Sequence, residues 1–324
     1  MKSFVLSMLG ATLFGGALAQ TPAATQWDLP TGYAVGSFQT ENVQQFAADV
    51  AKASGGKLKI VLHPNGSLYK ANEIKRAVQT GQAQAGEFIL SGAANENALF
   101  GVDSIPFLAD SYPAAKKLSD ASRPAIEKLL AAQGMKLLFV SPWPGQSLYS
   151  SKPVETIADL KGTKMRAYNP ATSRIAQLAG AQPTTIQLAE LGQALATGTV
   201  ENFLTSSASG VENKLYESVK YFYGVNAWLP KNAVVVQAKA FETLDKPTQE
   251  ALLKSAAAAE ARGWATSEQK NNEYLKELAA KGMKVAAPSE ALTRELRKIG
   301  ATMTAEWLKQ AGPDGQAVID AFSK

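Results

Sequence analysis

The sequence predicts an α/β protein that folds as two domains. Its 324 residues exceed the usual size of one domain, and 46% of them are apolar, which is enough for a packed core in each half. Strand-like segments alternate with amphipathic segments over residues 26–90, and this order favours sheets joined by helices. Residues 247–281 are rich in Ala, Glu, Lys and Gln, and a helix of that length, roughly 50 Å, would run along both domains.

The first part of the chain shows both periodicities clearly. Within 40–53, apolar residues recur at i, i+3, i+4 and i+7 from Val43 onward, which predicts an amphipathic helix. Residues 57–63 alternate in hydrophobicity and are followed by a Pro-Asn-Gly turn, which predicts a strand. The other elements expected here are a strand and loop over 26–35, a helix over 72–80 and a strand over 86–90. Such alternation is typical of a parallel sheet.

The middle of the chain contains a helical pattern over 112–134 that is interrupted by Pro124, which we place in the first turn of a second helix. A buried strand is expected over 135–140. The following Ser-Pro-Trp-Pro-Gly segment, 141–145, is rigid and is the expected crossing between domains. Later elements are strands over 163–167 and 200–205, helices over 173–179 and 190–197, apolar runs over 220–225 and 233–238, and shorter terminal helices over 292–322.

The composition excludes several classes of site. The chain has no Cys, which excludes thiol nucleophiles, iron–sulfur clusters and cysteine zinc sites, and its single His63 excludes sites with several histidines. The formal net charge is +5, but Lys and Arg are interleaved with Asp and Glu instead of gathered in runs. We therefore expect no metal, no cofactor and no nucleic-acid partner.

Residues 1–19 are typical of a secretory signal. Lys2 precedes a short apolar run over 4–13, and Ala17-Leu18-Ala19 matches a small-residue cleavage site. The apolar run is too short to span a bilayer stably. We therefore expect cleavage after Ala19 and a mature chain that is exported to the periplasm.

Two short motifs suggest chemistry that the rest of the sequence does not support. Ser67-Leu-Tyr-Lys70 matches the S-x-x-K pair of periplasmic serine acyl enzymes, although the partner motifs S-D-N and K-T-G are absent from the sequence. This enzyme is kept as an alternative. Gly81 and Gly86 have the spacing of a phosphate-binding loop, but Glu87 stands where the loop needs Lys and would repel phosphate. The structural interpretation, a helix end before a strand, is favoured.

Arg166 is the strongest candidate for binding. It lies at the predicted end of a strand, directly before the turn Asn169-Pro170, and ligands of open α/β sheets bind beyond the carboxyl ends of strands. A guanidinium there can hold a carboxylate through two parallel hydrogen bonds. From spacing alone, a surface salt bridge is the alternative. A second group of candidates consists of aromatic residues beside polar or flexible turns, namely Tyr33, Phe38, Phe88, Trp143, Tyr168 and Trp228.

Three segments resemble one known family. Residues 152–166 read Lys-Pro-Val-Glu-Thr-Ile-Ala-Asp-Leu-Lys-Gly-Thr-Lys-Met-Arg, residues 180–183 read Gly-Ala-Gln-Pro, and residues 215–221 read Leu-Tyr-Glu-Ser-Val-Lys-Tyr. These segments are similar to stretches of the DctP-type substrate-binding proteins of tripartite ATP-independent periplasmic (TRAP) transporters. The resemblance extends over essentially the whole mature chain.

The resemblance implies a two-domain periplasmic solute-binding protein fold with an interdomain cleft, hinge strands and one long helix shared by both domains. The implied ranges are 20–142 with 229–262 for domain I, 143–228 with 263–324 for domain II, and about 247–281 for the shared helix. It further implies that Arg166 binds the carboxylate of an organic acid, that the protein is not an enzyme, and that it is a monomer delivering its ligand to a TRAP membrane permease. A ligand-sensing partner of a membrane receptor would use the same cleft.

Departures from the family pattern narrow the expected ligand. Gln146 stands near the position where sialic-acid-binding members carry a second arginine, and Thr205 and Ser206 stand near a cleft asparagine of many members. The sequence therefore predicts a monocarboxylate with an apolar or aromatic body, such as an aromatic 2-hydroxy or 2-keto acid. The expected ligand-binding residues are Tyr33, Phe88, Trp143, Gln146, Arg166, Asn169, Thr205, Ser206 and Trp228.

Overall fold

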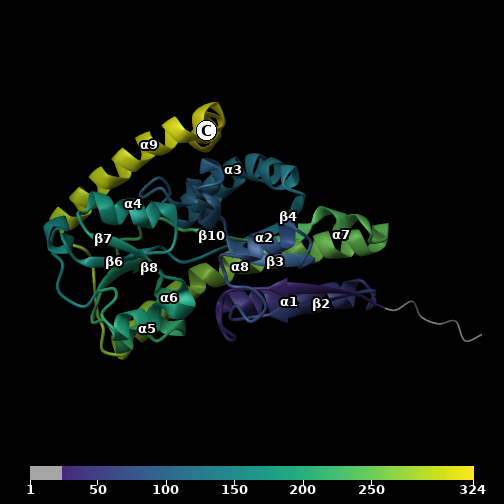
Figure 1. Ribbon diagram of the computed structural model, residues 1–324, viewed down its shortest axis with the longest axis horizontal. Coiled ribbons are helices and arrows are strands. Elements are labelled where there is room, and N and C mark those ends of the chain that lie inside the picture. Colours follow the sequence, from purple (N-terminus) through teal and green to yellow (C-terminus); the bar gives the residue numbers. More distant parts are fainter. Residues whose placement is uncertain (1–23) are drawn as a thin grey trace, which may run out of the picture.

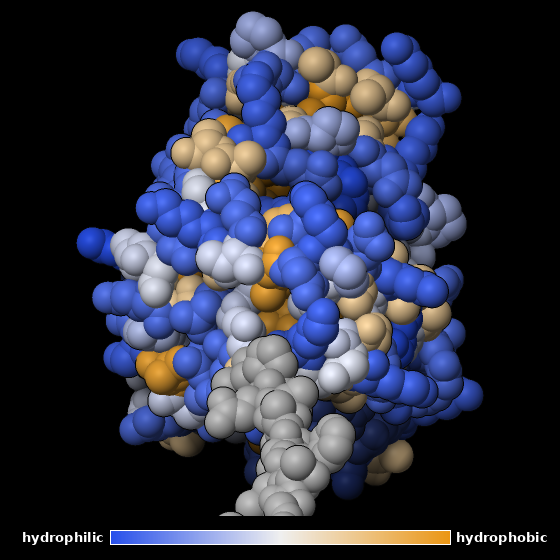
Figure 2. Space-filling view, turned by 90° about the vertical axis from the view of Figure 1, so that its right-hand side faces the viewer, coloured by the Kyte–Doolittle hydropathy of each residue, from blue (hydrophilic) through white to orange (hydrophobic). Residues whose placement is uncertain are grey.

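The computed structural model describes residues 24–324, in which two groups of strands are each flanked by helices (Figure 1). We call the group near the N-terminus the first lobe and the other group the second lobe. The signal sequence expected over 1–19 lies outside the described residues. Among residues 24–324, no helix combines the length and the apolar character that a membrane span requires. The viewed face of the surface is mostly hydrophilic, with small apolar patches (Figure 2).

The first lobe contains two small sheets that lie against each other. Strand β1 (Thr25–Pro30) pairs in parallel with β2 (Leu58–His63), and β10 (Lys231–Gln237) pairs antiparallel with both β3 (Ala85–Ile89) and β4 (Met135–Pro142). Its helices are α1 (Phe38–Ala53), α2 (Ile74–Gln79), α3 (Tyr112–Ala132) and α7 (Ala238–Glu242), with the 3₁₀ helices η1 (Leu90–Ala93) and η2 (Ala98–Ser104). Apolar side chains of these helices and strands form its core.

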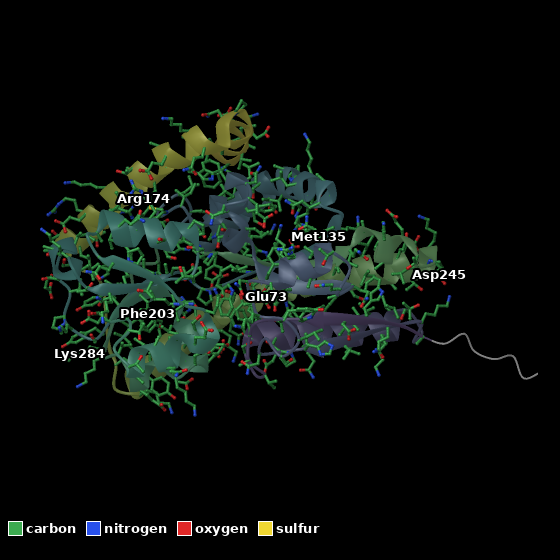
Figure 3. The ribbon with its side chains drawn as sticks, viewed as in Figure 1. Glu73, Met135, Arg174, Phe203, Asp245 and Lys284 are labelled. Carbon is green, nitrogen blue, oxygen red and sulfur yellow. The ribbon has the colours of Figure 1, made fainter. Side chains whose placement is uncertain are left out.

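The second lobe is built on one sheet with the strand order β11-β9-β5-β8-β6-β7. The strands are β5 (Ser147–Ser150), β6 (Lys164–Ala167), β7 (Gln182–Thr185), β8 (Asn202–Thr205), β9 (Tyr221–Tyr223) and β11 (Lys284–Ala286). The helices are α4 (Pro170–Leu178), α5 (Leu191–Ala196) and α6 (Ser207–Glu212), with η3 (Ile157–Leu160), η4 (Leu188–Glu190) and η5 (Leu215–Glu217). Phe203, labelled in Figure 3, lies in this core. The ring of Tyr149 stacks on it, with ring centroids 4.9 Å apart.

Two long helices belong to both lobes. Helix α8 (Lys246–Ala280) packs Leu252 into the first-lobe core and Leu278 into the second-lobe core. Helix α9 (Glu290–Ser323), which is kinked at Gly312, packs its first half in the second lobe and Trp307 in the first. At Gly263, α8 passes so close to β4 that an added Cβ would lie 2.6 Å from the hydroxyl of Ser141. The expected long helix over 247–281 is therefore confirmed, whereas the residue ranges of the two domains stay a prediction.

One expectation about local structure is wrong, and a second is confirmed only in part. Helix α3 continues through Pro124 instead of restarting there, because Leu118 before the proline and Ile126 after it both pack in the first-lobe core. The parallel sheet expected over residues 26–90 is found only in part: β1 and β2 pair in parallel, but β3 belongs to a separate sheet in which β10 runs antiparallel to both of its neighbours. A strand that returns from the distant part of the chain sets this direction, and local periodicity contains no signal for it. Strands β5, β7 and β11 and helix α6 were not predicted from the sequence.

Candidate functional site

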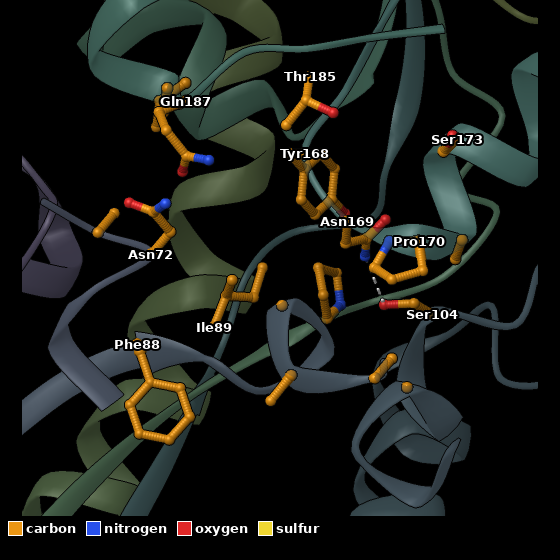
Figure 4. Close-up of a pocket in the computed structure, with 18 of the residues that line it drawn as sticks. Asn72, Phe88, Ile89, Ser104, Tyr168, Asn169, Pro170, Ser173, Thr185 and Gln187 are labelled. Carbon is orange, nitrogen blue, oxygen red and sulfur yellow. Dashed lines mark hydrogen bonds between the residues drawn. The ribbon is translucent and has the colours of Figure 1, made fainter. Parts of the chain in front are cut away.

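A cleft of about 1000 Å³ lies between the two lobes and is lined by both. The first lobe contributes Asn72, Phe88 and Ile89 to its wall, and the second lobe contributes Tyr168 and Asn169 on the opposite side (Figure 4). Two lobes that face each other across a hollow of this size provide the usual geometry of a small-molecule site. The cleft is therefore the candidate site.

Arg166 lies in β6, where the following residues turn into α4 and face the cleft. Its side chain is almost fully buried, with 3% of its surface exposed. The Nε atom donates a hydrogen bond to the carbonyl of Ile186 at 2.9 Å, and the guanidinium carbon lies 5.2 Å from the centroid of the Tyr168 ring. These contacts leave the two Nη groups without a protein acceptor among residues 24–324.

No carboxylate balances this buried charge. Among the described residues, no Asp or Glu oxygen lies within 4.0 Å of Arg166. Burial lowers the pKa of Arg166 to about 10, so the group keeps its charge at neutral pH. A buried cation without a counterion is energetically unfavourable, and an anion that enters the cleft would relieve this cost. The planar fork suits a carboxylate in particular.

Asn169 caps α4 and also joins the lobes. Its Oδ1 accepts from the backbone N–H of Thr172 at 2.8 Å, which fixes the start of the helix. Its Nδ2 donates to the hydroxyl of Ser91 at 2.9 Å and to that of Ser104 at 3.4 Å, both in the first lobe (Figure 4). This amide therefore holds one rim of the cleft together.

Tyr168, Gln146 and Trp228, on the second-lobe side of the cleft, form a chain of hydrogen bonds. The hydroxyl of Tyr168 donates to Oε1 of Gln146 at 3.2 Å, and Nε1 of Trp228 donates to that same hydroxyl at 3.3 Å. Tyr168 and Gln146 line the cleft, whereas Trp228 is buried behind Tyr168 and is not on the wall. Trp228 can therefore position Tyr168 but is not placed to touch a ligand.

The structure places seven of the nine expected ligand-binding residues on the cleft wall. These are Tyr33, Phe88, Trp143, Gln146, Arg166, Asn169 and Thr205. Ser206 is not among the lining residues, because its hydroxyl accepts from the backbone N–H of Ser209 and caps α6. Phe38, the other aromatic candidate, packs its ring 5.3 Å from that of Trp143, centroid to centroid, and also lies behind the wall.

Glu87 is a candidate site residue that was not predicted from the sequence. It lies in β3 and lines the cleft, although only 1% of its surface is exposed. Its carboxyl group accepts hydrogen bonds from the hydroxyl of Thr31 and the amide of Asn232. Burial raises the pKa of Glu87 above its ordinary value. A single acidic residue inside an otherwise apolar strand was the signal that could have revealed it.

The serine and lysine of the S-x-x-K motif do not form a catalytic pair in this structure. Ser67 and Lys70 are both exposed, in the segment between β2 and α2. Within residues 24–324, no hydrogen bond joins their side chains, and only Lys70 lines the cleft. No group of three or more potential metal ligands occurs in the described part of the chain.

The chain is similar to solute receptors over nearly its whole length. The model of the family DctP, "Bacterial extracellular solute-binding protein, family 7", matches residues 31–310. DctP6 of Bordetella pertussis, an extracytoplasmic solute receptor binding pyroglutamic acid, is 51% identical, with a TM-score of 0.91 and coverage of 92% of this chain and 99% of that one.

Two further relatives agree with that family. A marine metagenome TRAP solute-binding protein, solved with co-purified pyroglutamate, is 44% identical with a TM-score of 0.91, and the match covers 93% of this chain and 99% of that one. A solute-binding protein of Albidiferax ferrireducens is 29% identical over 188 residues, which is 57% of this chain and 55% of that protein.

Proposed function

Because the chain belongs to the DctP family of bacterial extracellular solute-binding proteins, which are receptors and not enzymes, we propose that it captures a small organic acid in the periplasm for a TRAP membrane permease. One observation carries the proposal: the guanidinium of Arg166 is buried on the cleft wall without a carboxylate partner in the described chain. A ligand carboxylate would complete the pair through two charge-assisted hydrogen bonds.

The ligand is proposed to be a monocarboxylate. Arg174 also lines the cleft, but it already pairs with Glu306 through hydrogen bonds of 3.0 and 2.6 Å. Gln146 and Thr205, which also line the cleft, are neutral. Within the described residues, one unpaired buried guanidinium therefore faces the cleft, and this suits a ligand with one acid group.

The first candidate ligand is pyroglutamate, a cyclic amide that carries one carboxylate. It is supported by two solved relatives that bind it and are 51% and 44% identical to this chain over more than nine-tenths of its length. The second candidate is the aromatic 2-hydroxy or 2-keto acid expected from the sequence. It is supported by the rings of Phe88, Trp143 and Tyr168 on the cleft wall, since such rings stack on aromatic ligands.

Ligand binding is proposed to close the two lobes, because contacts to both walls form only when the walls approach. We also propose that the mature protein begins after Ala19, acts as a monomer and delivers its ligand to the permease. A sensing role would use the same closed state and differs only in the membrane protein that recognises it.

A thermal-shift screen of purified protein, followed by calorimetry, tests the proposed ligand class. The panel contains pyroglutamate, an aromatic 2-hydroxy acid, the matching 2-keto acid, succinate and sialic acid. We expect the largest rise in melting temperature with pyroglutamate, and a smaller or no rise with the two-charge succinate. Stabilisation by succinate or sialic acid alone would contradict a monocarboxylate site. Labelling of Ser67 by a fluorophosphonate probe would instead favour the acyl enzyme.

A further inference from the structure

Glu87 is a buried carboxyl group on the first-lobe wall, opposite the lobe that holds Arg166. Its Oε2 accepts from the hydroxyl of Thr31 at 2.5 Å, and its Oε1 accepts from Nδ2 of Asn232 at 2.9 Å. Within residues 24–324, no Lys or Arg nitrogen lies within 4.0 Å of it. Burying a carboxyl group without a cation beside it costs free energy, so its position on the cleft wall requires an explanation.

The surrounding hydrogen bonds fix Glu87 as an acceptor. Nε1 of Trp143 can only donate, and it points at Oδ1 of Asn232 at 2.9 Å. The hydroxyl of Tyr33 donates to that same oxygen, also at 2.9 Å. The amide of Asn232 is therefore held with its Nδ2 toward Glu87, so the facing Oε1 must accept. The hydroxyl of Thr31 accepts from the backbone N–H of Tyr33 at 3.3 Å and donates its own hydrogen to Oε2 of Glu87.

This network leaves part of the acceptor capacity of Glu87 unused. A carboxylate accepts about four hydrogen bonds, and protein donors provide two of them here. The side chain lines the cleft, so the remaining lone pairs are within reach of a molecule that occupies it. An incoming N–H would add a third donor in a dry environment, where charge-assisted hydrogen bonds are strong.

We propose that Glu87 is a specificity-determining residue that accepts a hydrogen bond from an amide N–H of the ligand while Arg166 holds the ligand carboxylate. The inference rests on the proposed function, because it requires an organic acid in the cleft. The ligand class that it selects is a small cyclic amide with one carboxylate. Plain keto acids, which have no such donor, are disfavoured.

Opposite charges on the two walls would also orient the ligand. Glu87 repels a carboxylate, and Arg166 attracts it, so only one arrangement of the ligand satisfies both walls. Burial is the largest effect and raises the pKa of Glu87 above its ordinary value, the donors Thr31 and Asn232 offset part of that rise, and a ligand N–H would shift the balance toward the ionised form that accepts it. A ligand that places an oxygen beside Glu87 instead would be repelled, because the lone pairs of that oxygen would face those of the carboxylate.

The test compares pyroglutamate with its lactone analogue, 5-oxotetrahydrofuran-2-carboxylate, in which a ring oxygen replaces the N–H. The two acids have nearly the same shape and charge, so calorimetry on the full mature chain isolates the donor. We expect wild type to bind the lactam at least thirtyfold more tightly, which corresponds to about 2 kcal/mol. In Glu87→Gln, the preference should fall below threefold.

A matched control is Glu212→Gln. Glu212 is a half-buried carboxyl group whose Oε1 accepts from two donors, the backbone N–H of Phe38 and the hydroxyl of Tyr274, but it does not line the cleft. Its neutral variant should keep the lactam preference of wild type. Thermal unfolding of each variant checks that it is folded. The comparison of lactam with lactone binding by wild type does not depend on any variant.

The outcomes separate the two proposals. If wild type binds neither acid, the proposed ligand class and this inference both fail. If wild type binds both acids equally, or if Glu87→Gln keeps the preference, the role of Glu87 fails while the organic-acid receptor stands. A preference that disappears in Glu87→Gln and persists in Glu212→Gln supports the role.

Discussion

Arg166 on the second-lobe wall and Glu87 on the first-lobe wall are both buried ionisable groups, yet their surroundings differ. Glu87 accepts hydrogen bonds from two side chains of its own lobe, and one of these, Asn232, is itself held by Trp143 and Tyr33. Arg166 is held by one backbone carbonyl and the face of one ring. On the first-lobe wall, Glu87 is thus held in a hydrogen-bond network and can still accept further hydrogen bonds. On the second-lobe wall, Arg166 is a cation without an anionic partner among the described residues.

This difference separates two tasks of recognition. An incomplete ion pair binds any accessible carboxylate strongly, because the missing charge is the largest unmet interaction in the cleft. A completed and rigid network discriminates among ligands, because its donors and acceptors cannot rearrange to suit a wrong partner. Affinity is therefore expected to depend mainly on the second lobe, and selectivity mainly on the first.

Arg166→Ala should have the largest effect on affinity. The ligand carboxylate would be desolvated without a partner, so we expect a loss of about 2–5 kcal/mol in binding free energy, measured by calorimetry with the acid that stabilises wild type. Arg166→Lys should also lose affinity, because a single ammonium cannot form the fork. Binding within threefold of wild type in the alanine variant would contradict the anchoring role.

Glu212→Gln should change the pH dependence of stability without changing ligand choice. Burial, the largest cause, raises the pKa of Glu212 to about 7, so its neutral form stabilises the fold below the ordinary value of 4.5 and this contribution is lost as pH rises through 7. The variant does not titrate. Relative to it, wild type should lose on the order of 2 kcal/mol of unfolding free energy between pH 4.5 and 8.

Urea unfolding at several pH values measures that difference. An unchanged gap between wild type and Glu212→Gln across this window would show that the group does not titrate there. A change in ligand selectivity in Glu212→Gln would show that Glu212 influences ligand binding even though, unlike Glu87, it does not line the cleft.

Trp143→Phe should have the smallest effect, about 1 kcal/mol in unfolding free energy, because it removes one donor to Asn232 and keeps the Tyr33 donor. The lactam preference should weaken as the amide loses its fixed orientation. Trp264→Phe is the matched control, since it removes the same ring volume and its Nε1 has no hydrogen-bond partner in residues 24–324. Equal losses in the two variants would count against the network.

The same contrast explains what the sequence could predict. The helix over 40–53 follows from its periodicity and the helix over 247–281 from its composition, and both appear within two residues of their expected bounds. Arg166 could also be predicted from the sequence as a binding residue, because a family motif and the predicted end of a strand coincide there. Both depend on neighbours in the sequence.

Glu87 depends on partners far away in the sequence. Its donors come from Thr31 and Asn232, which lie 56 and 145 residues from it. No local pattern reports that these three side chains meet, and the glycine spacing before Glu87 suggested only a failed phosphate loop. Similarly, Ser206 follows Thr205 directly but turns to cap α6, because successive residues at the end of a strand point in different directions.

The helices α8 and α9, which each pack in both cores, have a consequence for folding. Neither lobe retains a complete core if the chain is cut between them, because each core includes side chains from these shared helices. The lobes are thus a single cooperative unit, and heating should give one calorimetric transition instead of two. Half-molecules made from either lobe alone would lack the apolar partners that they need to fold.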